Sequence, residues 1–183
     1  PGNDDQFIVS KYNPGAAAEK EYYLSLDGGG KTIKFAIFSG ASGRQLVLQA
    51  SDLPIVSGRW HHIVAVFTGT VSSGTPASSG ISIYVNGVAT TSSSSITGGA
   101  FTYIPESIAF FSVGNHFNNP TNTDMLGSIA EVAVWHQALT SDDIQVLYNF
   151  RDTIEYIFSS GFVNLPPRVL LRQLDNATGS YPT

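Results

Sequence analysis

The densest group of side chains that could bind a ligand lies in a polar segment at residues 114–124, which reads GNHFNNPTNTD. It supplies one carboxylate, from Asp124, and several amide oxygens, the first of them from Asn115. Calcium in proteins takes about six to eight oxygen ligands from carboxylates, amides and backbone carbonyls. We therefore expect any bound calcium to lie here, with Asp124 and Asn115 as ligands and with Asp27 added if its turn lies nearby. The alternative is that these Asx side chains cap their own backbone, as is common in turns.

The same segment has the residue types of a sugar-binding site. Such sites combine an amide or carboxylate for the hydroxyls with an aromatic ring that stacks on the apolar face of the sugar. Tyr12 or Tyr103 is a second possible source of the ring. The candidate ligand-binding residues are His116, Phe117, Asn118, Asn119 and Asn122. The alternative is that the ring of Phe117 is buried and only anchors its loop.

The residues that could catalyse a reaction do not form a recognisable catalytic group. A glycosidase needs two carboxylates, about 5–5.5 Å apart in the retaining kind, whereas Glu131 is the only acid in the strand-like run at residues 126–135. His61 and His62 are adjacent, so on a strand they point to opposite faces and cannot bind one metal ion. No nucleophile elbow or phosphate-binding glycine loop is found. We therefore expect that the protein is not an enzyme.

Composition narrows the class of protein further. A chain of 183 residues is long enough for one all-β domain with a large core. Its net charge of −5 argues against a nucleic-acid partner, because such a partner needs a basic surface. The chain has no cysteine and no apolar run long enough to span a bilayer, so we expect neither disulfides nor membrane insertion. Because Pro1 is not an initiator methionine, we also expect a piece of a longer protein.

Alternation of apolar and polar residues predicts the strands that must position the polar segment. Runs at 60–68 and 81–85 flank a Gly/Ser-rich insert, and Asn86-Gly87 follows as a two-residue hairpin turn. Runs at 21–26 and 32–38 form a second predicted hairpin. Further strands are predicted at 7–11, 46–49, 107–113 and 126–135.

The sequence also predicts where some segments and side chains lie relative to the sheets. Residues 107–113 are apolar on both faces, which predicts a central place in a sheet. Residues 89–99 are almost all Thr, Ser and Gly, which predicts either a polar loop or an edge strand with a wet outer face. The aromatic residues on the strands are expected in the core; they are Phe35, Trp60, Phe67, Phe110 and Trp135.

One helix is predicted, near residues 140–150. Thr140 and Asp143 have the spacing of a capping box, in which each side chain bonds to the backbone of the other residue. Leu139 and Ile144 fall at the positions of a hydrophobic staple. This helix should therefore begin just after Thr140 and pack one apolar face on the sheets.

Four blocks of the sequence read WHHIVAVF at 60–67, IYVNG at 83–87, LGSIAEVAVW at 126–135 and, after Ala138, a capped helix that reaches Tyr148. In order and spacing they resemble the laminin-G-like group of the concanavalin A-like lectin/glucanase superfamily. The resemblance implies an all-β fold, an antiparallel β-sandwich jelly roll with one short helix. The catalytic signature of that superfamily, Glu-x-Asp-x-x-Glu, does not occur in this chain.

The resemblance also divides the chain. It assigns residues 1–150 to the laminin-G-like domain and leaves residues 151–183 as a C-terminal extension, a linker or a tail that contacts a partner. The first two strands of the family have no counterpart here, so an edge near residues 129–135 needs another strand. That strand comes from residues 168–174 folding back, from the parent protein or from a neighbouring subunit, and we expect the parent protein or a partner.

What the resemblance implies for function is a non-catalytic recognition module. Such a module would bind a glycan or a protein through its rim loops, on an extracellular, cell-surface or virion-surface protein. The alternative is a structural or assembly module of a virion, fibre or surface filament, which contacts neighbouring subunits or other domains of its parent chain. One fold hosts many functions, so the ligand must be argued from the site itself.

Overall fold

The computed structural model describes residues 5–16, 19–27, 31–39, 44–50, 53, 55–69, 80–90, 92–97, 103–116, 123–149 and 169–171. The first strands along the chain are β1 (Gln6–Tyr12), β2 (Lys20–Leu26), β3 (Ile33–Ser39), β4 (Arg44–Ala50), β5 (Ile63–Phe67) and β6 (Ile81–Val85). The remaining elements are β7 (Val88–Ala89), β8 (Ser92–Thr97), β9 (Phe111–Val113), β10 (Val132–Val134), α1 (Ser141–Asn149) and β11 (Val169–Leu171). In the part of the chain that the structure describes, the fold is therefore mostly β with one short helix, as predicted.

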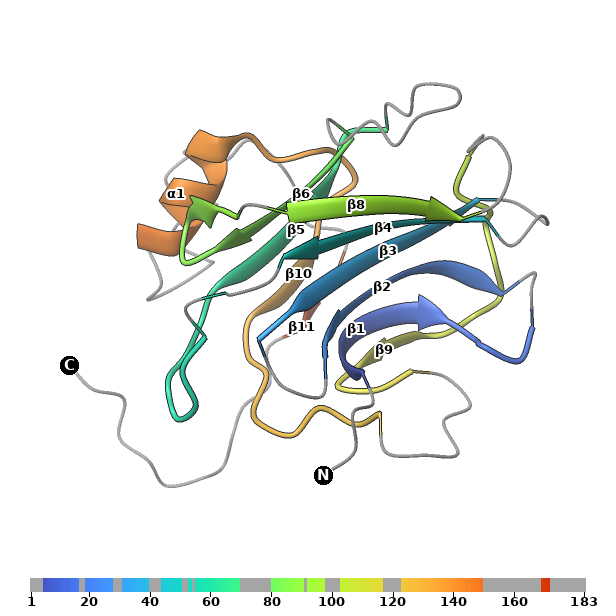
Figure 1. The fold of residues 1–183 in the computed structure, drawn as a ribbon, viewed down its shortest axis with the longest axis horizontal. Coiled ribbons are helices and arrows are strands. Elements are labelled where there is room, and N and C mark those ends of the chain that lie inside the picture. Colours follow the sequence, from blue (N-terminus) through green and yellow to red (C-terminus); the bar gives the residue numbers. More distant parts are fainter. Residues whose placement is uncertain are drawn as a thin grey trace.

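The strands form antiparallel sheets (Figure 1). The larger sheet has six strands in the order β8-β4-β3-β2-β1-β9, and a three-stranded sheet has the order β5-β6-β7. A separate pair consists of β10 and β11. The segment at 89–99 contributes β8 at the edge of the larger sheet, which is the edge-strand alternative of the two considered from the sequence.

The main core lies between the larger sheet and β6, because the alternation predicted for β2, β3 and β6 directs their apolar side chains inward. Ile33, Ile37 and Ile83 are almost completely buried there. The other buried members of this core are Leu24, Leu26, Ala50, Ile81 and Val85, and Phe35 and Phe67 pack against it as predicted.

Two local motifs form as the sequence predicted. Asn86 and Gly87 both adopt positive φ, 53° and 79°, in the turn that joins β6 to β7. At the start of α1, the Thr140 amide donates to Asp143 Oδ2 over 2.9 Å, and the Asp143 amide donates to Thr140 Oγ1 over 3.2 Å. Leu139 and Ile144 are buried together against β5 and β6, so the capping box and the hydrophobic staple are confirmed.

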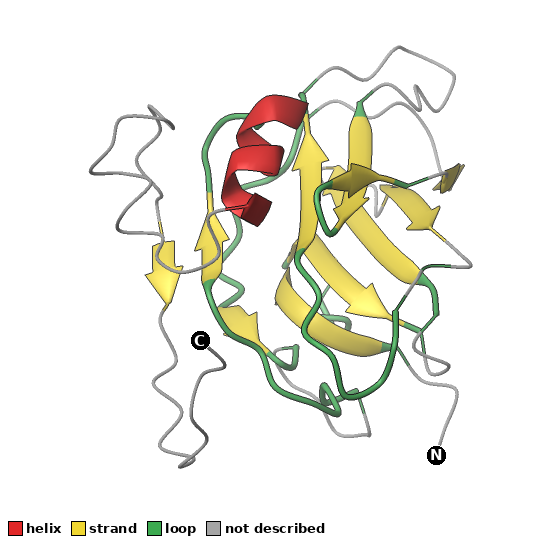
Figure 2. Cartoon of the chain, turned by 90° about the vertical axis from the view of Figure 1, so that its left-hand side faces the viewer, coloured by secondary structure: helices red, strands yellow, loops and turns green. Residues whose placement is uncertain are grey.

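Helix α1 covers the other face of the three-stranded sheet (Figure 2). Ile144 and Leu147 pack with Val64 and Val66 of β5, and Trp135 joins the same cluster. We call this group the helix cluster. No helix in the described part of the chain combines the length and apolar character needed to cross a membrane.

The prediction for residues 107–113 was wrong. Only Phe111–Val113 form a strand, and β9 lies at the edge of the larger sheet rather than at its centre. Ile108 and Phe110 are exposed, at 83% and 64% of their surface. An apolar run on both faces indicates a covered strand only if other elements cover it, and that depends on the tertiary structure.

Two more expectations need correction. Trp60 is not in the core: 67% of its surface is exposed, in the turn before β5, and Phe110 is likewise exposed. The predicted strand at 126–135 is reduced to Val132–Val134, and Glu131 just before it has a φ of 56°. Positive φ is unusual for a residue with a side chain and is incompatible with a regular strand, so the strand begins after Glu131.

The edge near residues 129–135 is partly covered by the chain itself. β11 pairs antiparallel with β10, with Val132 opposite Leu171 and Val134 opposite Val169. We expected the parent protein or a partner to supply this strand, whereas the structure places a segment of residues 168–174 there. The division of the chain at residue 150 stays a prediction.

Candidate ligand-binding site

An aromatic cluster lies on the face of the larger sheet that points away from the main core. Tyr23 of β2 and Phe38 of β3 lie on this face because they alternate with the buried Leu24 and Ile37. The ring centroids of Tyr23 and Phe38 are 5.9 Å apart, and Tyr12 of β1 stacks on Phe38 at 5.1 Å. Tyr12 also contacts Tyr23 edge-on, at 5.3 Å.

Phe7 joins the cluster because β1 is irregular. The register between β1 and β2 shifts between Phe7 and Val9, so Phe7 pairs with Ser25 while Val9 pairs with Leu24. Without this shift, Phe7 and Val9 would point to the same face. Phe7 is instead turned outward, where its ring meets Tyr23 edge-on at 5.0 Å. We call Phe7, Tyr12, Tyr23, Phe38 and His116 the aromatic face.

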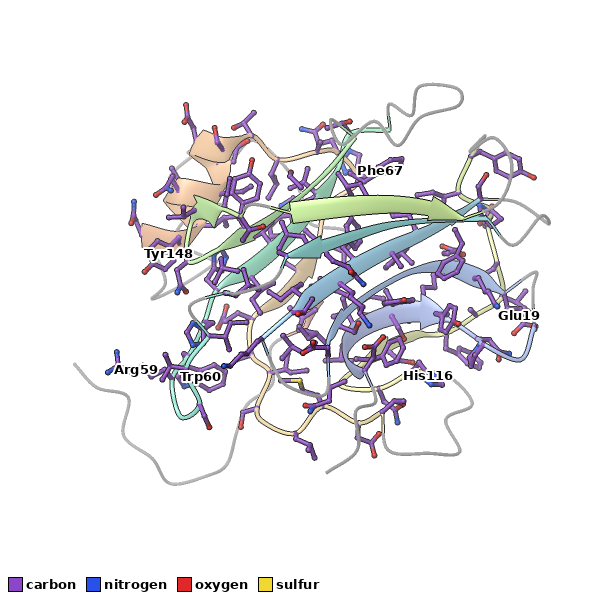
Figure 3. All side chains as sticks on the ribbon, viewed as in Figure 1. Glu19, Arg59, Trp60, Phe67, His116 and Tyr148 are labelled. Carbon is purple, nitrogen blue, oxygen red and sulfur yellow. The ribbon has the colours of Figure 1, made fainter. Side chains whose placement is uncertain are left out.

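His116 reaches this face from the segment that follows β9. Its ring stands edge-on to Phe7, at 4.7 Å between centroids, and to Tyr12, at 6.0 Å. Only 8% of its surface is exposed. The Ser10 hydroxyl holds the preceding residue by donating to the backbone carbonyl of Asn115 over 3.0 Å. Asn115 and His116, two described residues of the polar segment, therefore lie at the aromatic face, and Figure 3 labels His116 there.

The two lysines at this face have different partners. Lys34 Nζ lies 2.7 Å from a carboxylate oxygen of Asp5. The ammonium of Lys20, in contrast, lies over the ring of Tyr12, 5.5 Å from its centroid, and over Phe38 at 6.0 Å. Such cation–π contacts are worth roughly 0.5–2 kcal/mol, depending on exposure. No carboxylate within the described ranges forms an ion pair with Lys20.

The phenol groups of the face are held in their neutral form. Burial raises the pKa of Tyr12 above its ordinary value. Burial also raises the pKa of Tyr23, and the nearby charge of Asp5 adds to the effect. A neutral phenol can both donate and accept a hydrogen bond. Both side chains are only half-buried, so a ligand on this face can touch their rings and hydroxyls.

The structure describes only some of the ligand-binding residues that were predicted from the sequence. His116 and Asn115 lie at the aromatic face, and Tyr12, the alternative stacking ring, belongs to it. Tyr103 is exposed, at 61% of its surface, and is not among the rings in contact there. The remaining candidates, Phe117, Asn118, Asn119 and Asn122, lie outside the described residues.

The proposed calcium ligands flank the start of β1. Backbone bonds from Phe7 to Thr123 and from Met125 to Gly114 bring Asp124 to the side of β1 that faces β9. Asp27 follows Leu26 of β2 on the other side of β1. Its Oδ1 accepts hydrogen bonds from the amides of Lys31 and Thr32, so at least this carboxylate caps its own turn.

Within the part of the chain that the structure describes, no three His, Asp or Glu side chains gather as metal ligands would. Calcium at Asp124, Asn115 and Asp27 therefore stays a prediction. Amide and backbone oxygens can also bind calcium, and part of the polar segment lies outside the described residues.

Sequence reasoning missed three members of the aromatic face. Tyr23 and Phe38 were recoverable, because the predicted hairpin of 21–26 and 32–38 places both on its outer side. Phe7 was not recoverable, because a register shift in β1 reverses its direction.

A comparison with protein families identifies the class of protein to which this fold belongs. The chain belongs to the Concanavalin A-like lectin/glucanases superfamily: a laminin G family model with this description matches residues 1–145. This match confirms the resemblance seen in the sequence and implies a concanavalin A-like fold. No curated protein and no solved structure matches the chain.

Proposed function

We propose that this domain is a non-catalytic recognition module that binds a glycan on the aromatic face and the adjoining polar segment. The observation that carries the proposal is a group of rings in contact on a sheet surface outside the main core. Tyr12 contacts both Tyr23 and His116 there, and His116 also contacts Phe7. Phe7, Phe38 and His116 are buried and support the face, whereas Tyr12 and Tyr23 are half-buried and so remain within reach of a ligand. We place this domain outside cells, on a cell surface or on a virion surface.

The chemistry of the face suits a sugar ring. The half-buried rings of Tyr12 and Tyr23 offer surfaces on which the C–H groups of a pyranose can stack. Their neutral hydroxyls can bond to sugar hydroxyls, and the ammonium of Lys20 lies beside them as a further donor. The donors and acceptors of the polar segment, including those of Asn118 and Asn119, would complete the contacts.

The test is binding to a glycan array, followed by calorimetry with the glycans that bind. Tyr12→Ala should reduce affinity at least about tenfold, which corresponds to the loss of roughly 1.4 kcal/mol. Tyr103→Ala is a matched control, since it removes an exposed tyrosine outside the face. Substitution of Asn118 or Phe117 should also abolish binding. Glycan binding that survives Tyr12→Ala and Tyr23→Ala together would place the site elsewhere.

A protein ligand or an assembly role is the second candidate. It is favoured by the exposed large apolar side chains near β9 and the start of the 126–131 segment, namely Ile108, Phe110 and Leu126. Exposed apolar side chains are available for contacts with other proteins. In that case the domain would be a structural module of a virion, fibre or surface filament, and the rim loops would be buried against adjacent subunits in the assembled particle.

The proposal also excludes catalysis. Glu131, the one acid in the predicted strand at residues 126–135, is exposed and precedes β10 in a left-handed conformation. We expect no turnover of a panel of β-glucans. Turnover that disappears in Glu131→Gln would show that the domain is a hydrolase.

A further inference from the structure

One edge of β5 points away from β6, the described strand with which β5 pairs. The Asn86 amide donates to the carbonyl of His62 over 2.8 Å, and the Thr68 amide donates to the carbonyl of Gly80 over 2.9 Å. Because backbone groups alternate in direction along a strand, residues 62, 64, 66 and 68 face β6. The N–H and C=O groups of Ile63 and Ala65 therefore point to the opposite side, where β5 has no partner among the described strands.

β10 lies on that side of β5. Figure 2 shows the two strands in one layer, running in the same direction, with no described strand between them. Trp135, the residue after β10, packs in the helix cluster with Val64 and Val66 of β5. β10 pairs with β11, so one strand placed between β5 and β10 would join the two small sheets into a single sheet.

The side chains around these two edges are apolar on both faces of the layer. Ile63 and Ala65 point to the main core, whereas Val64 points to the helix cluster. All three residues of β10 and most of those of β5 remain only half-buried. A segment between the strands would therefore meet apolar neighbours above and below it, as a central strand does.

Trp135 supplies an independent observation. Its indole Nε1 is buried, and no hydrogen-bond acceptor lies within reach of it among the described residues. The indole nitrogen is a donor only, and a buried donor without an acceptor costs roughly 1–3 kcal/mol. A backbone carbonyl from a strand beside β10 is the kind of acceptor that this position requires.

We infer that β5 and β10 together accept an added β-strand, supplied by a separate partner protein. The occupant is an extended segment about as long as β5, apolar on both faces, free of proline and antiparallel to both strands. A second copy of this chain is a poorer donor. Each of its described strands already pairs within a sheet, so donating one would leave its own sheet incomplete.

The test uses residues 1–183 and a synthetic peptide of about nine residues, with central Val and Ile residues flanked by Thr and Lys to keep it soluble. Hydrogen exchange of backbone amides is followed by NMR with and without the peptide. The control peptide has the same sequence but is N-methylated at every central residue, which removes the backbone donors of both edges without changing the protein.

The expected result is specific to one edge. The peptide should slow exchange of the Ile63 and Ala65 amides at least about tenfold and leave those of Val64 and Val66 unchanged, because the latter two face β6. It should also shift the indole N–H resonance of Trp135. The N-methylated peptide should do neither.

Three outcomes would overturn the inference. The first is slow exchange at Ile63 and Ala65 in the monomer without peptide, which would show that the chain covers its own edge. The second is slow exchange that appears only in a dimer, which would make a second copy the occupant. The third is no protection at any peptide concentration. None of these results bears on glycan binding at the aromatic face, which lies on the other sheet.

Discussion

The ammonium of Lys11 lies 2.6 Å from Oε1 of Glu21, a carboxylate that is almost completely buried. The same oxygen accepts a hydrogen bond from the Ser107 amide over 2.6 Å. Glu21 therefore ties β1 and β2 to the segment that leads into β9. A buried carboxylate is tolerated only with such partners, so Glu21 has a structural role.

We predict that Glu21→Gln lowers the free energy of unfolding by about 1–3 kcal/mol, because Lys11 loses its counter-charge while the Ser107 amide keeps an acceptor. Glu21→Ala should cost more, since both partners are then unpaired. Urea unfolding measures both. Glu19→Gln is the control, because Glu19 lies in the β1–β2 loop and its side chain accepts a hydrogen bond from the side chain of Asn13 in the same loop. Equal stability of wild type and Glu21→Ala would refute this role.

Three partly buried tyrosines should make the folded domain less stable in alkaline solution. Burial raises the pKa of Tyr12, Tyr22 and Tyr23 in the folded state above the ordinary value of 10. The folded state therefore keeps protons that the unfolded state releases. The stabilisation is complete below pH 10 and is lost as the pH rises towards the folded-state pKa values.

Thermal melts between pH 8 and about pH 11 check this prediction, with phenolate absorbance as a second signal. Tyr23→Phe should flatten the alkaline part of the stability curve, because Tyr23 has the largest shift of the three. A curve of unchanged slope in Tyr23→Phe would show that other groups cause the loss.

Because Thr140 and Asp143 cap each other at the start of α1, substitutions of the two residues should have non-additive effects on stability. Thr140→Ala should cost about 1 kcal/mol, because the Asp143 amide loses its acceptor. Asp143→Ala should cost a similar amount, and the double variant should cost less than the two changes added together. Thr140→Ser keeps the hydroxyl and should be close to wild type. Fully additive losses would contradict reciprocal capping.

Substitution of Gly87 should cause both backbone strain and a steric clash, whereas substitution of Gly58 should cause backbone strain alone. A Cβ at Gly87 would lie 3.0 Å from both Gln145 Nε2 and Tyr148 Cδ1 of α1, and φ there is +79°. Gly58 has nearly the same φ, +78°, but nothing within 4 Å of its Cβ position. Gly58→Ala should cost about 1–2 kcal/mol for the backbone alone. Gly87→Ala should cost about 1–3 kcal/mol more, because it also displaces the helix. Equal losses of stability in the two variants would show that the side chains of Gln145 and Tyr148 move aside at no measurable cost.

Calcium provides the last prediction. If the polar segment binds calcium, a concentration about a hundredfold above Kd should stabilise the domain by about 2.7 kcal/mol. Asp124→Ala should abolish that increase. Asp27→Ala should lower stability with and without calcium, because its carboxylate caps a turn. A response that Asp124→Ala leaves intact would place the site elsewhere, and no response would favour the alternative in which the Asx side chains cap their own backbone.

The sequence by itself determined the features whose causes are local. The alternation in β2, β3 and β6, the Asn86-Gly87 turn and the cap at Thr140 depend on neighbours within a few residues, and all three form as predicted. The family could be recognised partly for the same reason, since two of its blocks, IYVNG and the capped helix, coincide with these local elements.

Only the tertiary structure decided which side chains meet and which stay exposed. Phe7 reaches the aromatic face through a register shift in β1, and His116 reaches it because β9 pairs with β1. Trp60, Ile108 and Phe110 are apolar in sequence yet exposed, because no described element covers them. Register and coverage depend on strands far apart in the chain, so the pattern of a single segment cannot specify them.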